Sequence, residues 1–172
     1  ENTHIKLKDF DRKLFGMFCE EYNNTFDISL MGSYNQNNIT QSFFRKGIYK
    51  EIDDIENEAL EVKKFFKNEA LILSNYIETG SDLIKKEQNE RDGHFLMTTK
   101  KRAEIITKKI GKDTEYTFKT QSANNIRIMS KKISAASEKL LAFESKLGTI
   151  MREKFLIKCD EFYNKFGDLF SR

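Results

Sequence analysis

The chain has 172 residues with no Pro and no Trp, one third of its residues are charged, and its net charge is +3. This length suits one globular domain or an elongated element with a small head, and the composition is typical of a helix-rich protein. No apolar run approaches the ~20 residues of a membrane-spanning helix, and the chain begins at Glu1 without a start Met, so we expect a piece of a longer protein with no membrane contact.

Positive charge is concentrated in the middle of the chain. Between Lys85 and Lys132 there are 13 Lys and Arg but only six Asp and Glu, a net charge of +7, whereas the remaining residues carry −4. Such an asymmetry predicts an anionic partner for the middle segment. The alternative is a well-solvated lobe whose lysines keep it soluble.

The N-terminal part of the chain predicts two helices separated by a polar loop. Apolar spacing favours a short amphipathic helix over residues 7–22, and the polar stretch 23–41 predicts a loop with an extended piece at 26–30. Over residues 48–78, apolar residues recur in steps of three and four with charged residues between them. This is a heptad seam, and Gly80 follows it as a helix stop.

A different pattern after Gly80 predicts a β-hairpin and two further strands. Residues 84–88 and 94–99 flank a polar turn that ends in Gly93, where positive φ is easily reached. The segments 115–120 and 125–129 alternate and are rich in β-branched and aromatic residues, which favours strands.

A short helix is predicted between these two pairs of strands, over residues 99–106. Thr98 or Thr99 is the expected N-cap, because Thr is a common residue at that position.

A second long helix is predicted from 133 to 170, with an apolar stripe from Leu140 to Leu169. This helix has more apolar surface than the first long helix can cover, so its surplus at 155–170 should pack on the first helix (7–22), on Phe43 and Phe44, or on other domains. We therefore expect a mostly α fold with a small β insert, in which a long antiparallel helix pair carries an antiparallel sheet at its tip. The expected segments are 1–80, 81–130 and 131–172.

Catalytic and metal-binding patterns are sparse. Cys19 and Cys159 lie far apart among apolar residues, so we expect reduced core thiols of an intracellular protein rather than zinc ligands. His94 alternates with residues of a strand and is interpreted as a surface residue of the sheet. Gly111 and Lys112 lack the other residues of a phosphate-binding loop. We expect no enzyme activity, no cofactor and no small-molecule substrate in this chain.

The basic middle segment carries the side chains that usually contact DNA phosphates. A Lys-Lys-Arg cluster opens the predicted short helix, and a helix N-terminus also attracts phosphate. Contacts of this kind grip the backbone without reading sequence, and neither a recognition helix nor an aromatic stacking platform is visible. The candidate DNA-backbone contacts are Lys100, Lys101, Arg102, Lys108, Lys109, Lys112, Lys119, Asn124, Asn125 and Arg127.

An ordered series of motifs resembles the lever and clamp region of the MutS family. Residues 42–55, SFFRKGIYKEIDDI, resemble the family segment F-I-R-x-G-x-x-x-E-L-D-E-L that opens its lever helix. Residues 79–99 resemble T-G-I…L-K-V-x-Y-N-x-x-x-G-Y-Y-I-x-V-T, and residues 124–130 resemble N-A-E-R-Y-x-T. A helix with Glu144 then follows like the returning lever, so that the resemblance covers roughly 42–170.

The resemblance implies a DNA mismatch repair role for a longer protein. In the family, the clamps of two subunits close over duplex DNA, and the levers run back toward an ATPase. Duplex DNA and a second MutS-like subunit are thus the implied partners, and ATP with Mg²⁺ is implied for the parent only. Asn124 matches the family's backbone-contacting Asn, and Lys119 falls on a nearby basic position. Glu87, Gln88 and Ala123 depart from the family pattern.

The absence of Pro and the abundance of Asn, Ile and Lys suggest an AT-rich genome and a eukaryotic or large-virus member. Nucleus, organelle and viral factory are not distinguished by the sequence. The alternative function is a coiled-coil hairpin for protein interaction or dimerisation, without DNA binding.

Overall fold

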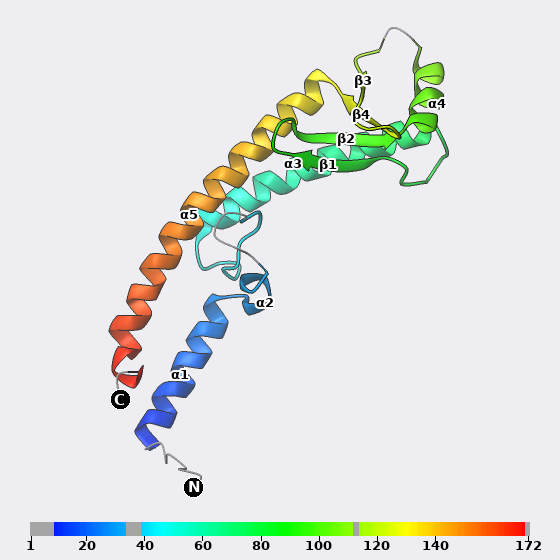
Figure 1. The fold of residues 1–172 in the computed structure, drawn as a ribbon. Helices are drawn as coiled ribbons and strands as arrows, with labels where there is room; N and C mark the ends of the chain where they lie inside the picture. The colour runs from blue at the N-terminus through cyan, green and yellow to red at the C-terminus, as the bar shows by residue number, and fades with distance from the viewer. Residues whose placement is uncertain (1–8, 34–38, 112–113, 171–172) are drawn as a thin grey trace. The chain divides into compact units, whose positions relative to one another are not determined.

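The computed structural model describes residues 9–33, 39–111 and 114–170 (Figure 1). The chain divides into two compact units, which we call unit 1 (residues 1–56 with 146–172) and unit 2 (residues 57–145). The elements in chain order are α1 (Asp9–Thr25), α2 (Ile28–Met31), α3 (Lys50–Asn75), β1 (Lys85–Asn89), β2 (Gly93–Thr99), α4 (Lys100–Ile110), β3 (Thr117–Thr120), β4 (Asn125–Met129) and α5 (Lys131–Phe170).

Aromatic rings hold unit 1 together. Phe18 of α1 packs against Phe162 and Phe166 of α5, with ring centroids 5.7 and 5.5 Å apart in edge-to-face geometry. Phe26, which follows α1, is buried, and its ring centroid lies 6.0 Å from that of Phe155. Such pairs add favourable quadrupole contacts to the burial of apolar area. Part of the apolar surplus predicted for the second long helix is therefore covered inside unit 1.

The segment predicted as a loop, 23–41, contains a helical turn. Asp27 accepts hydrogen bonds from the N–H groups two and three residues further on, each at 3.1 Å, and thereby caps α2. The prediction of an extended piece at 26–30 is wrong for 28–30, which belong to α2, whereas Asp27 has extended backbone with φ −89° and ψ 100°. Phe26 forms an isolated antiparallel bridge with Phe44.

The two long helices differ from their predicted ranges only at their ends. α3 is shorter than the predicted 48–78, and α5 begins two residues before the predicted 133. Ile48 precedes α3 and is 38% exposed, so it does not belong to the buried seam. The predicted segments 1–80, 81–130 and 131–172 separate the chain at helix ends, whereas the compact units divide it within α3 and α5.

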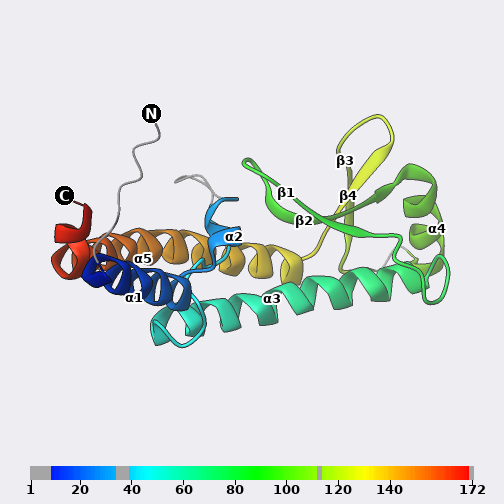
Figure 2. The ribbon, with the colours of Figure 1, turned by 90° about the horizontal axis from the view of Figure 1, so that it is seen from below.

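One aliphatic core joins the helices and the sheet of unit 2. Leu73 of α3 and Ile133 and Leu140 of α5 are fully buried together with Leu96 of β2 and Ile128 of β4. Within this unit, Figures 1 and 2 show the sheet beside the adjoining parts of α3 and α5. The core sits between the helices and one face of the sheet.

The sheet has the order β1-β2-β4-β3, and all its pairs are antiparallel. Leu96 lies opposite Ile128, and both face the core. Arg127 lies on the other face, because successive side chains of a strand point to opposite sides. Gly93 has a φ of +66° and ends the β1–β2 turn, which confirms the predicted hairpin. The fold is thus mostly helical with a small four-stranded antiparallel sheet, as the sequence predicted.

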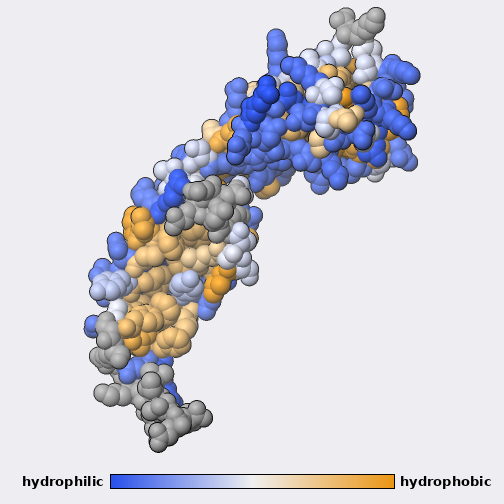
Figure 3. All heavy atoms as spheres, in the orientation of Figure 1, coloured by the Kyte–Doolittle hydropathy of each residue, from blue (hydrophilic) through white to orange (hydrophobic). Residues whose placement is uncertain are grey.

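The two units expose different surfaces. In Figure 3, apolar side chains gather over α1 and the C-terminal part of α5 in unit 1, whereas hydrophilic residues cover most of the visible surface of unit 2. Tyr163 of α5 is 74% exposed. Cys159 is exposed and Cys19 is half-buried, so the prediction of two core thiols is wrong for Cys159. Among the described helices, none is long and apolar enough to cross a bilayer.

Candidate nucleic-acid interface

Helix α4 presents the basic cluster that the sequence predicted at its start. Ala103 and Ile106 are buried, and Ile106 belongs to the core of unit 2, so one side of α4 is fixed against the sheet. Lys100 and Lys101 are exposed. Because α4 packs on the core through its apolar side, its lysines are held in place by a rigid element and not by a loop.

The start of α4 is joined to the turn between β3 and β4. The backbone N–H of Lys100 donates to the carbonyl oxygen of Asn124 at 3.0 Å. Thr99 lies directly opposite Asn125 in the pairing of β2 with β4. The side chain of Asn124 is exposed. Residues that are distant in the sequence therefore meet at one end of the sheet, where basic and amide side chains are adjacent.

The expected side-chain N-cap of α4 is absent. Thr99 occupies the cap position with φ −78° and ψ 157°, but its side chain makes no capping hydrogen bond. The Thr98 hydroxyl instead donates to the carbonyl oxygen of Leu83 at 3.2 Å. The first-turn N–H groups of α4 thus donate no hydrogen bond to the side chain of either predicted cap.

Both candidate arginines are engaged inside the protein. Arg102 is half-buried, and its Nη1 donates to the carbonyl oxygen of Leu83 at 3.3 Å. Arg127 forms an ion pair with Asp92, and its side chain is only 15% exposed. Lys119, directly opposite Arg127 in the pairing of β3 with β4, is exposed. In this structure the lysines and asparagines are better placed than the arginines to meet a ligand from solvent.

Two further candidates lie at the other end of α4. Lys108 and Lys109 are exposed in the last helical turn, whereas Lys112 lies outside the described residues. Lys108 and Lys100 border a groove of about 390 Å³ that also contains Phe118 of β3. With a rise of 1.5 Å per residue, ~12 Å separate the backbones at its two ends. The candidates on α4 thus form one group at its start and a second at its end, while Lys119 and Arg127 lie on the β3–β4 pair.

His94 is fully buried, so its interpretation as a surface residue is wrong. Its Nε2 lies 3.2 Å from a carboxylate oxygen of Glu144 on α5, and its Nδ1 lies 3.1 Å from Nζ of Lys86 on β1. Its backbone N–H donates to the hydroxyl oxygen of Ser137 at 2.8 Å. These contacts attach the β1–β2 hairpin to α5. The sequence held a signal for this burial, because His94 shares a sheet face with the core residue Leu96.

The lysine of this network is perturbed by its surroundings. Much of the Lys86 side chain is exposed, but its ammonium group lies over the ring of Phe66 at 5.8 Å from the centroid and next to His94. Removal of the ammonium from water lowers the pKa of Lys86, which Glu144 opposes and Lys63 reinforces. We assign these contacts to the attachment of the hairpin.

Two polar contacts connect the residues before β3 to the helices of unit 2. The Tyr116 hydroxyl donates to a carboxylate oxygen of Glu69 on α3 at 2.7 Å, and Glu115 forms an ion pair with Lys132 at 3.0 Å. Burial, followed by the bond to Glu69, raises the pKa of Tyr116. β3 begins at Thr117 and not at the predicted 115, because the register partner of Thr117 is Met129, the last residue of β4.

The arrangement can bind anions through charge and hydrogen bonds. Among the described residues, no group of three or more His, Cys, Asp or Glu side chains could hold a metal ion. Two grooves of unit 2, one beside α4 and one between the β3–β4 pair and α5, contain exposed lysines together with Thr or Ser, which are common phosphate contacts.

Comparison with known proteins gives one informative similarity. No family model matches the chain. The chain is similar to a mutS homolog of Acanthamoeba polyphaga mimivirus, which is named as a DNA mismatch repair protein, with 21% identity over 177 aligned residues. This match covers 88% of the chain but 16% of the relative, so the chain spans about a sixth of the relative's length. Similarity of this extent supports a MutS-like relationship.

Proposed function

We propose that unit 2 grips the sugar–phosphate backbone of duplex DNA without reading its sequence, as the clamp of a MutS-like protein. The hydrogen bond from Lys100 N–H to the carbonyl of Asn124 carries this proposal, because it joins the basic start of α4 to the turn between β3 and β4. Exposed lysine and asparagine side chains meet there, and both types bind phosphate oxygens. The similarity to a mutS homolog supports DNA as the anion.

We further propose that α3 and α5 act as the lever of this protein. They would relate the DNA-bound state of unit 2 to an ATPase in a longer polypeptide, where ATP and Mg²⁺ would bind. The chain itself would act by binding alone, and a second MutS-like subunit would supply the opposing clamp. The relative's much greater length leaves room for such parts.

Fluorescence anisotropy with labelled duplexes of random sequence tests the proposal. We expect dissociation constants of ~10⁻⁴–10⁻⁶ M that weaken steeply as salt increases, because phosphate contacts release counterions. Lys100→Glu combined with Lys101→Glu should weaken binding by at least about tenfold and reduce the salt slope by about two. Arg102 is left unchanged, because it also bonds to the backbone at Leu83.

Arg12→Glu combined with Lys13→Glu is the matched control, since it reverses two adjacent exposed charges on α1 of unit 1. Its duplex affinity should fall far less than that of the α4 variant. Equal losses in both variants would mean that net charge alone attracts DNA. Duplex affinity that does not change with salt concentration would contradict the proposal. Self-association in sedimentation without any duplex binding would also contradict it and would favour a protein-interaction module.

A further inference from the structure

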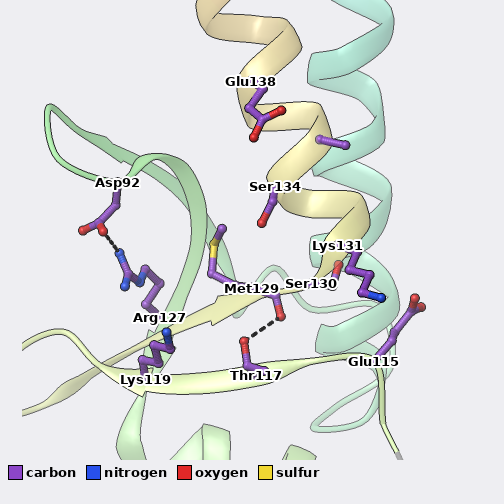
Figure 4. Close-up of a pocket in the computed structure, with 11 residues that line it drawn as sticks. Asp92, Glu115, Thr117, Lys119, Arg127, Met129, Ser130, Lys131, Ser134 and Glu138 are labelled. Carbon is purple, nitrogen blue, oxygen red and sulfur yellow. Dashed lines mark hydrogen bonds and ion pairs between the residues drawn. The ribbon is translucent and has the colours of Figure 1, made fainter.

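A groove of about 630 Å³ lies between the β3–β4 pair and the first turns of α5 (Figure 4). Three basic side chains line it: Lys119 of β3, Arg127 of β4 and Lys131 of α5. Asp92 lines it from the β1–β2 turn. Figure 4 shows Arg127 between Asp92 and Lys119, so the groove brings a carboxylate and two cations from three different elements to one place.

Two of these cations lie directly opposite each other. Lys119 and Arg127 are register partners in the antiparallel β3–β4 pair, so both side chains project from the same face of the sheet. Like charges at such positions are destabilising. Among the described residues, Lys119 has no ion-pair partner, whereas Arg127 has Asp92. An anion that contacts both cations would relieve this repulsion better than Asp92, which pairs with Arg127 alone.

The Arg127–Asp92 contact leaves the guanidinium incompletely satisfied. Asp92 binds Nη1, and the guanidinium carbon lies 5.7 Å from the centroid of the Phe95 ring. Nε is buried and has no hydrogen-bond partner in the described part of the chain. A buried donor without a partner is costly. A guanidinium can hold an oxyanion through two parallel N–H groups, which the present contact does not achieve.

Besides Asp92, two glutamates line the groove, but only one of them is available to offset its positive charge. Glu115 is engaged by Lys132 at 3.0 Å, which leaves Glu138 against Lys119 and Lys131. With Asp92 in place the groove is close to electrical balance. Removal of Asp92 from Arg127 would leave it positive.

We propose that this groove is a second phosphate site of the DNA-binding unit, in which the Asp92 carboxylate occupies the position of a phosphate group of the DNA backbone. A phosphodiester replaces Asp92 on Arg127 and is also contacted by Lys119. Asp92 is therefore an internal competitor that weakens DNA binding until the backbone is close. The inference rests on the proposed function, and it adds both a second site and its regulation.

Two substitutions that break the same ion pair separate this role from a structural one. Asp92→Asn removes the competing charge and should tighten duplex binding about two- to fivefold, which corresponds to the strength of a partly exposed ion pair. Arg127→Gln removes the guanidinium group that would bind the phosphate and should weaken duplex binding about tenfold. A merely structural ion pair would change affinity in the same direction in both variants. Glu90→Gln is the matched control, because it removes an exposed charge from the same turn and should have little effect.

A second readout follows the arginine itself. In ¹⁵N NMR spectra of the chain, the Arg127 Nε–H signal should shift on addition of a duplex or of inorganic phosphate, and at lower phosphate concentration in Asp92→Asn. Lys119→Gln, at an exposed position, should reduce the shift of the Arg127 signal at a given phosphate concentration. This variant replaces Arg127→Gln as the test if Arg127→Gln does not fold. If the Arg127 signal shifts with inorganic phosphate but not with duplex, the groove binds a free phosphate compound. This result would overturn its role in DNA binding.

The outcomes distinguish the inference from the proposed function. If the wild-type chain binds duplex and loses affinity in the α4 variant, while Asp92→Asn is neutral or weaker, the inference is wrong and the proposed function stands. If no variant binds duplex, the proposed function is wrong, and an Arg127 signal unmoved by inorganic phosphate would overturn the groove as an anion site as well.

Discussion

The two units of this chain reach stability in different ways. Unit 1 has 14 of the 21 Phe and Tyr residues and a net charge of −1, whereas unit 2 has seven and a net charge of +4. Rings packed edge to face fill unit 1, but the core of unit 2 is mainly aliphatic. Polar contacts from buried or half-buried groups then attach the hairpin and β3 of unit 2 to its helices.

Aromatic packing and exposed sheet faces suit different roles in a small protein. A large buried ring excludes water and leaves few polar groups to arrange, which suits a supporting role. A sheet with one face on the core leaves the other face for charged side chains, as Arg127 and Lys119 show. Stability and anion binding should therefore respond to substitutions in different units.

The largest expected effect is in unit 1. Phe26→Ala removes a side chain that is 1% exposed and whose ring centroid lies 5.0 Å from that of Tyr22 and 5.2 Å from that of Phe44. The loss of burial and the cavity should lower the free energy of unfolding by about 3–5 kcal/mol. Hydrogen exchange measured by mass spectrometry should show faster exchange in unit 1, and the duplex dissociation constant should change less than about twofold if the units divide their roles.

Phe15→Ala is the control, because Phe15 is 48% exposed and should cost about 1 kcal/mol or less. If Phe26→Ala reduces duplex affinity as strongly as the α4 charge reversal does, the contrast between a supporting and a binding unit fails.

The sequence predicted the elements of unit 2 better than its contacts. The turn before Gly93 and the alternation of 125–129 fixed the hairpin and β4, because turn chemistry and side-chain period are local properties. The alternation of His94 with Leu96 indicated a shared sheet face, but the partner of His94, Glu144, lies fifty residues further along the chain and could not be inferred from spacing. For the same reason the sequence placed Arg127 among the phosphate contacts without revealing its partner Asp92.

In unit 1, apolar periodicity predicted the helices but not which residues of each apolar stripe are buried. The stripe on the second long helix includes Cys159, which is exposed, alongside Phe162 and the buried Phe166. A stripe identifies one side of a helix, but the extent of the covering partner decides which of its members are enclosed.

An intermediate effect is expected at the hairpin of unit 2. Gly93 has a φ of +66°, and a Cβ there would lie 2.6 Å from Oγ of Ser137 and 2.9 Å from Cδ1 of Leu141. Gly93→Ala should therefore lower the free energy of unfolding by about 2–4 kcal/mol, from backbone strain and overpacking together. Thermal denaturation followed by circular dichroism, with urea titration for the free energy, would measure it.

Gly80→Ala separates the two causes. Gly80 has a φ of +80° but no atom within 4 Å of a Cβ, so only the backbone cost of about 1–2 kcal/mol should remain. Equal losses at both glycines would show that the close approach of Gly93 to α5 contributes nothing, and would weaken the view that the hairpin is attached tightly.

The smallest effect concerns the Asp92–Arg127 pair, and its sign follows from the titration of Asp92. The hydrogen bond from Arg127 is the main cause that holds the pKa of Asp92 below its ordinary value, with burial opposing it. A carboxyl group with a lowered folded-state pKa stabilises the protein above its unfolded pKa of about 3.9, and this contribution is lost as pH falls through the folded-state value. The stability difference between wild type and Asp92→Asn should thus be constant near neutral pH and shrink below about pH 4.

The unfolding free energy, measured against pH, separates stability from DNA binding at this one ion pair. Urea titrations from pH 2 to 7, with Glu90→Gln in parallel, would give the difference. A difference that does not change with pH would mean that the charge of Asp92 does not stabilise the fold. In Asp92→Asn, a small pH-dependent loss of unfolding free energy together with tighter duplex binding would show two roles for this carboxylate. It would stabilise the free chain by pairing with Arg127, and it would compete with phosphate for the same guanidinium group.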